Sequence, residues 1–346
     1  MNQSLNSFAA NRSTVIWTYQ LKVTTTAHVV YVIEGAIELI GNAFILLAIK
    51  LNTKLHTKYY CLPAYLAAAD FIQGIGQFSG GLRRLYLIFR YQHNYLVSSW
   101  DCAKTVPIFW WTWSCYLSNP ILLLISIDRC IACYNPMLYT KITAKTLSIA
   151  ASAVFVVALV IVCIMYLDTF LQQSSFLHSN LCFQASAFSK TVFQFTIDYQ
   201  LVTGALSVAV YLAALYFMRK GSKISDSSFL SRQKQRQVVV TRMLVSVVMC
   251  TFFLQTIPII IRSLAYKLQV SNLTLINPIV WAIISLNYLN NVIIYVIKNA
   301  DIRYSIFCLL RCRHPNPRLV APALATVLAG LRRKSYANSA ELRIAS

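Results

Sequence analysis

Several polar side chains lie within long apolar stretches of this sequence, where each needs a reason to be present. The group comprises Asn42, Asp70, Ser118, Asn287 and Asn291. A charge at the centre of a helix in lipid costs roughly 2.5–3.5 kcal/mol on insertion scales. One carboxylate with hydroxyl and amide partners could bind a small cation through oxygen ligands, or hold a network of water. Alternatively, each group only hydrogen-bonds a neighbouring helix.

Adjacent opposite charges, Asp128 and Arg129, end the third long apolar stretch, shortly before Asn135-Pro136. Such a pair can hold itself at a membrane edge, and a guanidinium group has further donors for another partner. The pair could also be a plain stop signal, but its place ahead of Asn135-Pro136 makes a specific role the better interpretation.

Further carboxylates lie near the other ends of the apolar stretches. Glu34 and Glu38 are four residues apart and therefore share one face of a helix. We expect them to be hydrated near the outer interface, with a ligand cavity or a proton path as the alternatives. Asp198 in the expected fifth span is a better candidate than Glu34 or Glu38 for lining a cavity.

The composition defines the class of protein. Of the 346 residues, 58% are hydrophobic and 12% are charged, and the mean hydropathy is +0.58. Soluble domains are nearer 45–50% apolar and 25% charged, so a cytosolic enzyme and a disordered chain are excluded. The apolar residues form blocks of the length that a helix needs to cross about 30 Å of hydrocarbon. The sequence therefore predicts an all-α membrane protein.

Seven blocks read as membrane spans, and Pro120 and Pro258 are expected to kink the third and the sixth. The chain has no soluble domain: we expect an N-terminal segment at 1–26, a membrane domain at 27–297, an amphipathic helix at 298–313 and a tail at 314–346. The expected spans are about 27–49, 59–81, 105–133, 146–167, 193–217, 239–264 and 275–297.

The charges predict the orientation. The formal net charge is +21, and 22 of the 31 Lys and Arg residues fall on the side of the C-terminal tail. Positive residues concentrate in the cytosol, so the N-terminus is predicted to be extracellular and the basic charge does not indicate nucleic acid. Asn2 and Asn11 lie in glycosylation triplets on the predicted outer side, each of which could equally be a chance match.

The order of these motifs resembles the rhodopsin-like G-protein-coupled receptors and, within them, the nematode serpentine chemoreceptors of the SX class. The resemblance covers about residues 30–312. The motifs that carry it are Gly41-Asn42, Leu66 to Asp70, the run Ala68 to Phe78, Ile127-Asp128-Arg129-Cys130, Asn135-Pro136-Met137-Leu138-Tyr139, Asn291-Val292-Ile293-Ile294-Tyr295 and Asn299 to Arg303.

The resemblance implies roles for several of these residues. Arg129, released from Asp128, would turn toward Tyr295 and contact the α subunit of a heterotrimeric G protein. Asp70, Ser118, Asn287 and Asn291 match a cluster that binds sodium and water. Cys102 and Cys182 match the family disulfide, and of the ten cysteines these two alone are clearly on the oxidising side.

Three substitutions at motif positions put the activation relay in doubt more than the fold. Cys130 replaces the usual Tyr, Val292 replaces the usual Pro, and Thr256 stands where a Trp is common. Since the seventh span has no lysine, a retinal Schiff base is ruled out.

The tail and the outer half carry the remaining candidates. Residues 302–313 read as a short amphipathic helix on membrane lipids, in which Cys308 and Cys312 are palmitoylation sites or plain thiols. Candidate ligand-pocket residues are Trp110, Trp111, Trp113, Asp198, Gln255 and Tyr266.

The sequence thus predicts a plasma-membrane chemosensory receptor that binds an extracellular small molecule and activates a G protein. A neuropeptide-type receptor is the nearest alternative. A cation- or proton-coupled transporter using Glu34, Glu38, Asp70 and Asp198 is a different class, but no inverted repeat supports it. No span carries a nucleophile–base pair or a metal motif, so we expect no enzyme, no metal and no cofactor beyond a sodium ion near Asp70.

Overall fold

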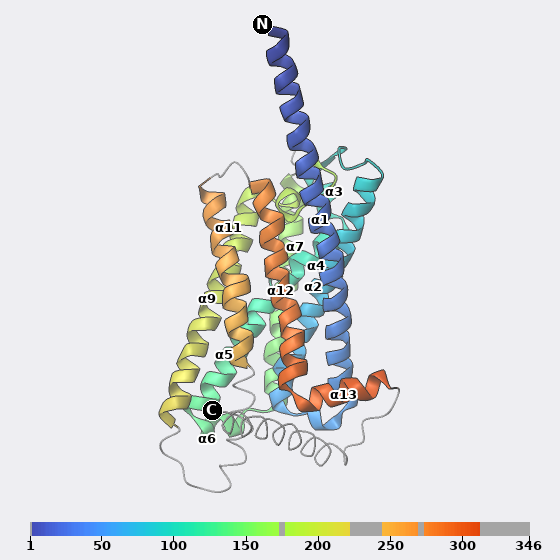
Figure 1. Cartoon of the computed structure of the whole chain (residues 1–346). Coiled ribbons are helices and arrows are strands. Elements are labelled where there is room, and N and C mark those ends of the chain that lie inside the picture. Colours follow the sequence, from blue (N-terminus) through green and yellow to red (C-terminus); the bar gives the residue numbers. More distant parts are fainter. Residues whose placement is uncertain (1, 173–176, 222–243, 269–272, 312–346) are drawn as a thin grey trace, which may run out of the picture.

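The chain folds as a bundle of long helices, as its composition predicts (Figure 1). The computed structural model describes residues 2–172, 177–221, 244–268 and 273–311. Within these, six helical stretches are long and apolar enough to cross a membrane, which confirms a multi-pass helical membrane protein. They are Lys22–Leu51, Val106–Tyr134, Ala144–Gln172, Lys190–Lys220, Leu244–Ala265 and Ile279–Lys298.

Within the described residues, one two-stranded sheet lies at the end that carries the disulfide. The strands β1 and β2 are antiparallel, and Val97 pairs with His178. The elements are α1 (Asn2–Leu51), η1 (Thr53–Leu55), α2 (Lys58–Phe89), β1 (Leu96–Ser98), α3 (Ser99–Ala103), α4 (Val106–Cys115), α5 (Ser118–Tyr134), α6 (Pro136–Lys141), α7 (Ala144–Gln172), β2 (Leu177–Ser179), α8 (Gln184–Ala187), α9 (Lys190–Gly221), a helix from 244 to 251, η2 (Phe252–Thr256), α11 (Ile257–Lys267), α12 (Leu273–Lys298) and α13 (Ala300–Leu310).

Two expected boundaries differ from the structure. The predicted N-terminal segment is already helical from Asn2, and this part of α1 projects beyond the other helices (Figure 1). The second expected span continues to Phe89, so α2 has 32 residues, or about 48 Å at 1.5 Å per residue. It is long enough to cross a membrane but less apolar than the other six, because it carries Asp70, Gln73 and Gln77 in its buried face.

Glycines let α1 and α2 approach each other's backbone closely. A Cβ atom at Gly35 would lie 2.5 Å from the backbone nitrogen of Phe78. On the other side of α2, a Cβ atom at Gly76 would lie 2.7 Å from the backbone nitrogen of Trp111. Small residues at helix interfaces in membranes have this effect, and here they fix α2 between α1 and α4.

Both prolines interrupt their helices more strongly than the expected kinks. The third span is two helices, α4 and α5, separated at Tyr116 and Leu117. Pro120 has no N–H to donate to the carbonyl of Tyr116, four residues earlier, and its ring clashes with that carbonyl. The five residues of η2 that precede Ile257 and Pro258 form a π-helix, a type of distortion that is common at functional sites.

Two buried apolar clusters fill the bundle. One, toward the end that carries α13, is built around Leu66, Ile121 and Tyr295. The other, toward the disulfide, is built around Tyr31 and Trp111 and is richer in aromatic residues. The bundle interior thus has two environments, an apolar one around Leu66, Ile121 and Tyr295 and a more aromatic one around Tyr31 and Trp111.

Candidate functional site

The Asp128–Arg129 pair is buried at the end of α5 nearest α13, below called the inner end. Arg129 is 2% exposed, and its Nε donates to the Asp128 Oδ2 at 2.9 Å. Its Nη2 also contacts that carboxylate and donates to the Tyr139 hydroxyl at 2.8 Å. Charge-assisted bonds of this kind are roughly twice as strong as neutral ones. The arginine is thus held by a carboxylate and a phenol of its own chain.

Tyr139 is a residue of this site whose role the sequence did not reveal. It belongs to α6, which starts because the Asn135 side chain accepts a hydrogen bond from the Leu138 N–H at 3.0 Å. Lys58 donates to the Tyr139 carbonyl at 2.8 Å, and its ammonium lies 3.9 Å from the ring centroid. Burial raises the pKa of the Tyr139 hydroxyl above its ordinary value, so it remains a neutral donor and acceptor at physiological pH.

The resemblance predicted that Arg129 turns toward Tyr295. Tyr295 belongs to the buried apolar cluster around Leu66 and Ile121. Its side chain is fully buried, and its hydroxyl has no hydrogen-bond partner among the described residues. No hydrogen bond in that part of the chain joins it to Arg129. In this conformation Arg129 is paired with Asp128, and no described residue pairs with the Tyr295 hydroxyl.

The predicted polar core separates into smaller groups. The Asp70 carboxylate accepts hydrogen bonds from Asn291 Nδ2 at 2.9 Å and from Ser118 Oγ at 3.4 Å. The Asn291 Oδ1 is buried without a partner among the described residues. A carboxylate, a hydroxyl and a free amide oxygen are ligands that a small hard cation accepts, so this group fits such an ion.

The other two members of the predicted core bind different partners. Asn287 donates to Gln255 Oε1 at 3.0 Å and accepts from Thr251 at 3.2 Å. Asn42 donates to the Glu38 carbonyl at 3.0 Å. Asn287 therefore connects α12 to the sixth membrane helix, and Asn42 stays within α1.

The expectation that Glu34 and Glu38 are hydrated is wrong. Glu34 is 7% exposed and accepts from Gln77 Nε2 at 3.0 Å, and Gln77 in turn accepts from Ser285 at 2.9 Å. Glu38 is fully buried, and neither of its carboxyl oxygens has a partner in the described part of the chain. The reason is the close approach of α1 and α2 at Gly35, which encloses this face of α1.

The three candidate tryptophans do not line one site. Trp110 and Trp113 both contact Phe109 on the side of α7. The Phe109 ring centroid is 5.4 Å from that of Trp110, in an edge-to-face pair, and 6.1 Å from that of Trp113, in a tilted pair. Trp111 points inward instead, is 4% exposed and meets Trp281 edge to face at 5.2 Å. Trp111 is therefore the one of the three that faces the bundle interior.

The remaining pocket candidates are also separate from one another. Asp198 is half-buried, accepts from Gln194 of the same helix at 2.9 Å and lines a shallow, open groove with other residues of α9. Gln255 is buried and bound to Asn287. The side chain of Tyr266 lies outside the described residues.

Two arginines that the charge count placed simply on the outer side are buried inside the bundle. Arg84 is 2% exposed and Arg262 is 4% exposed. For Arg262, which lies inside the expected sixth span, burial could have been predicted, because an arginine within a membrane helix must face either the bundle or water. Arg84 lies beyond the expected end of the second span at residue 81.

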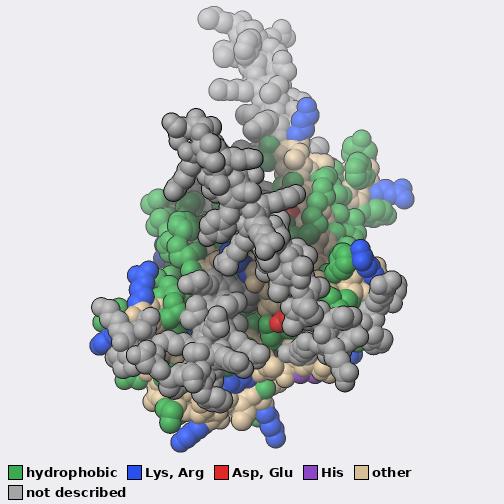
Figure 2. Space-filling model, turned by 60° about the horizontal axis from the view of Figure 1, so that its bottom comes forward, with side chains coloured by type: hydrophobic (Ala, Val, Ile, Leu, Met, Phe, Trp, Pro, Cys, Tyr) green, Lys and Arg blue, Asp and Glu red, His purple; other side chains and the backbone are tan. Residues whose placement is uncertain are grey.

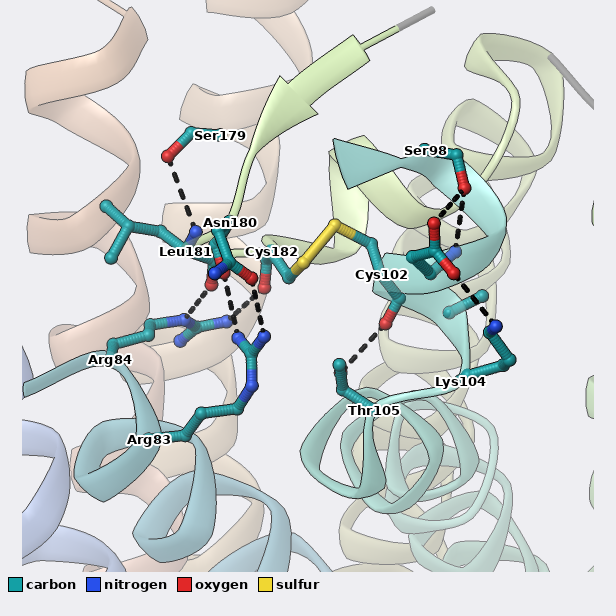
Figure 3. The surroundings of a disulfide bond; sticks show 12 residues. Arg83, Arg84, Ser98, Cys102, Lys104, Thr105, Ser179, Asn180, Leu181 and Cys182 are labelled. Atoms are coloured by element: carbon teal, nitrogen blue, oxygen red, sulfur yellow. Dashed lines mark hydrogen bonds and ion pairs between the residues drawn. A yellow bond between two sulfur atoms is a disulfide. The ribbon is translucent and has the colours of Figure 1, made fainter. Parts of the chain in front are cut away.

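The expected disulfide, Cys102–Cys182, is present and has a Cα–Cα distance of 5.1 Å. Beneath it, Arg84 donates to the carbonyls of Leu181 at 3.0 Å and Cys182 at 2.9 Å (Figure 3). Arg83 binds the carbonyl of Asn180 at 2.9 Å. The loop after β2 is thus held to α2 by hydrogen bonds and to α3 by a covalent bond.

The last described helix, α13, packs against the inner end of the bundle (Figure 1). Asn299 caps it by accepting from the N–H groups of Asp301 and Ile302, and the Ser305 hydroxyl accepts from Asn52, the residue after α1, at 2.7 Å. Phe307 and Leu310 are exposed. The Cys308 side chain is 8% exposed, and Cys312 lies outside the described residues.

Figure 2 looks toward this inner end, where Lys and Arg side chains are frequent and Asp and Glu side chains are few. Apolar side chains cover the flanks of the bundle. An apolar girdle next to a basic end is typical of a helical membrane protein.

The geometry defines a multi-pass helical membrane protein with a buried Asp–Arg pair at one end and a disulfide-tied loop at the other. The sequence profile of the serpentine-type 7TM GPCR chemoreceptor family Srsx matches residues 36–310. The chain belongs to this family. The predicted relationship is therefore confirmed, and the family is one of 7TM GPCR chemoreceptors, which is a class of receptors.

Proposed function

We propose that this protein is a plasma-membrane receptor that binds a small extracellular molecule in its outer half and activates a heterotrimeric G protein at its inner end. The observation that carries the proposal is the buried Arg129, whose guanidinium is held by Asp128 and Tyr139 at the basic inner end. A group held by bonds that can be exchanged for others is the kind of two-state element a switch requires.

The seven-span topology belongs to this proposal. The helix α2 completes the seven spans, since its length suffices and its polar face is turned into the bundle. The N-terminus is then extracellular, with Asn2 and Asn11 as glycosylation sites, and α13 lies on the inner leaflet with Phe307 and Leu310 toward lipid. Cys312 remains a proposed palmitoylation site, whereas the buried side chain of Cys308 favours a plain thiol there.

Ligand entry would shift an existing equilibrium between conformations. The interrupted helices at Tyr116–Leu117 and at η2 are the places where α5 and the inner half of the sixth helix can move against their outer halves. The group of Asp70, Ser118 and Asn291 lies among the buried residues between the helices and would hold a sodium ion in one of the two states.

The test is a second-messenger assay in cells that express the wild type or Arg129→Ala, exposed to volatiles, amphiphilic metabolites and peptides. We expect a response in the wild type that is lost in a mutant that still reaches the surface. Arg90→Gln, which removes an exposed arginine, is the control and should respond normally. A peptide as the only agonist would favour a neuropeptide-type receptor. A ligand-evoked current or solute flux that is the same in the wild type and in Arg129→Ala would contradict the proposal and favour a transporter.

A further inference from the structure

Arg262 is a buried cation that has no ion-pair partner among the described residues. It lies in the outer part of the sixth membrane helix and is 4% exposed. Its guanidinium carbon is 4.7 Å from the ring centroid of Trp281 and 4.9 Å from that of Phe193. Within the described residues, the only ion pairs are Lys104–Asp101 and Arg129–Asp128, and no hydrogen bond reaches the Arg262 side chain.

No carboxylate of the described residues forms an ion pair or a hydrogen bond with the Arg262 guanidinium. Glu34 is bound to Gln77, and Asp198 is bound to Gln194. Residues 2–21 and 269–278, whose side chains are not described, contain no Asp or Glu. Among the described residues, no negative charge therefore pairs with Arg262.

A second buried cation lies across the same aromatic pair. The Arg84 guanidinium carbon is 5.2 Å from the Trp111 ring, and Trp111 meets Trp281 at 5.2 Å. Arg84 uses two nitrogens on the loop carbonyls, while its Nη1 is buried with no partner among the described residues. Two guanidinium groups thus flank one pair of tryptophan rings.

Energetics favour an anionic occupant. A buried charged group without hydrogen bonds is expensive, far more so than a neutral polar group. The planar fork of a guanidinium matches a carboxylate with two parallel hydrogen bonds, and flanking indole rings suit an apolar or aromatic body. The same burial that makes Arg262 costly in the empty protein makes it selective for an anion.

We propose that Arg262, assisted by Arg84, is the recognition site for a small organic carboxylate whose apolar body packs on Trp111 and Trp281. This inference rests on the proposed receptor function and names its class of ligand. The neutral analogue of such a ligand would leave the guanidinium unpaired and bind far more weakly.

The experiment measures binding and signalling separately. The purified full-length protein is heated in detergent with straight-chain carboxylates of two to ten carbons, benzoate or phenylacetate, each beside its primary amide, and the shift in melting temperature gives an apparent affinity. The variants are Arg262→Met and Arg262→Lys, with Arg90→Gln as the matched control for a lost exposed arginine. The same compounds are applied to cells with the second-messenger readout.

We expect at least one carboxylate to stabilise the wild type and Arg90→Gln, and its amide to do so at least tenfold more weakly. Arg262→Met should lose the effect, and Arg262→Lys should weaken it at least tenfold, since an ammonium cannot form the bidentate pair. If Arg262→Met does not fold, the Arg262→Lys variant still tests whether the guanidinium binds the carboxylate.

Three results would overturn the proposal: no carboxylate stabilises the wild type, amides match their acids, or both Arg262 variants bind as the wild type does. Carboxylate binding without a second-messenger response would leave the site standing and contradict the receptor function. A response to neutral or cationic compounds alone would leave the receptor standing and contradict the site.

Discussion

Arg129 and Arg262 are two buried arginines in one bundle that the protein treats in opposite ways. Arg129, 2% exposed, has a carboxylate and a phenol of its own chain as partners. Arg262, 4% exposed, lies over two aromatic rings and has no ion-pair partner among the described residues. A charge that is compensated internally can serve as a switch, because its partners can be exchanged. A charge left uncompensated is suited to recognition, because it stabilises the complex with an anion.

The largest expected effect on stability comes from removing the carboxylate partner of Arg129, which leaves Arg129 without an ion pair, as Arg262 is. Asp128→Asn removes the carboxylate and leaves Arg129 buried, which should cost about 3–5 kcal/mol and lower the melting temperature of the purified protein strongly. The matched control is Asp101→Asn, which breaks the exposed pair with Lys104 at 2.8 Å and should cost about 0–1 kcal/mol. Equal losses in the two variants would contradict the buried pairing.

The outer aromatic site can be disturbed without touching either arginine. In Gly76→Val, the new side chain meets the backbone of Trp111, so we expect a loss of about 1–3 kcal/mol from overpacking and a weaker response to outer ligands. Gly204→Ala is the control, because its Cβ would have only an ordinary contact at 3.4 Å, with the Thr256 hydroxyl. Thermal unfolding and dose–response curves of the two variants check this, and a tolerated valine at position 76 would refute the close approach.

A single hydroxyl tests how tightly the inner arginine is held. Tyr139→Phe removes the 2.8 Å bond to Arg129 and should cost about 1.5–3 kcal/mol, the range for bonds to charged groups. Because Arg129 is then easier to release, basal second-messenger output should rise. Tyr59→Phe keeps a ring whose centroid is 5.9 Å from the Arg129 guanidinium and should behave as the wild type. If the basal second-messenger output of Tyr139→Phe is unchanged, the hydrogen bond between Tyr139 and Arg129 does not restrain receptor activation.

The smallest effect is the pH dependence of the exposed outer pair. Hydrogen bonds from Lys104, then from Ser98, lower the pKa of Asp101 below its ordinary value. A lowered pKa contributes stability that is present above about pH 4, the value of an unfolded Asp, and is lost as the pH falls through the lower folded value. The melting temperatures of wild type and Asp101→Asn should therefore differ by the same small amount from pH 5 to 8 and converge only in stronger acid.

The sequence predicted the helices, the disulfide and the family, because hydropathy and motif order depend on local composition. It did not predict orientation within a span. Arg84 and Arg262 were counted only as outer charges, although both face the interior. Trp110 and Trp113 lie three residues apart on one helical face, so their separation from Trp111 could have been anticipated from the helical period.

Other features depended on tertiary contacts that no local pattern contains. The burial of Glu38 results from the approach of α2 to α1. The division of Asn287 and Asn291 between two networks results from which helix each side chain meets, although the two asparagines are four residues apart on α12. The bond from Tyr139 to Arg129 depends on the path of α6.

The contrast between the two arginines is tested most directly by the melting temperature of the ligand-free Arg262→Met protein in the detergent used for the wild type. Replacing an uncompensated buried charge by an apolar side chain of similar volume should stabilise the empty protein, by about 1–4 kcal/mol on the precedent of other buried ionic groups. A higher melting temperature than that of the wild type is therefore the expected result. A clear decrease, like the one expected for Asp128→Asn, would mean that Arg262 is compensated within the fold and would contradict its role in recognition.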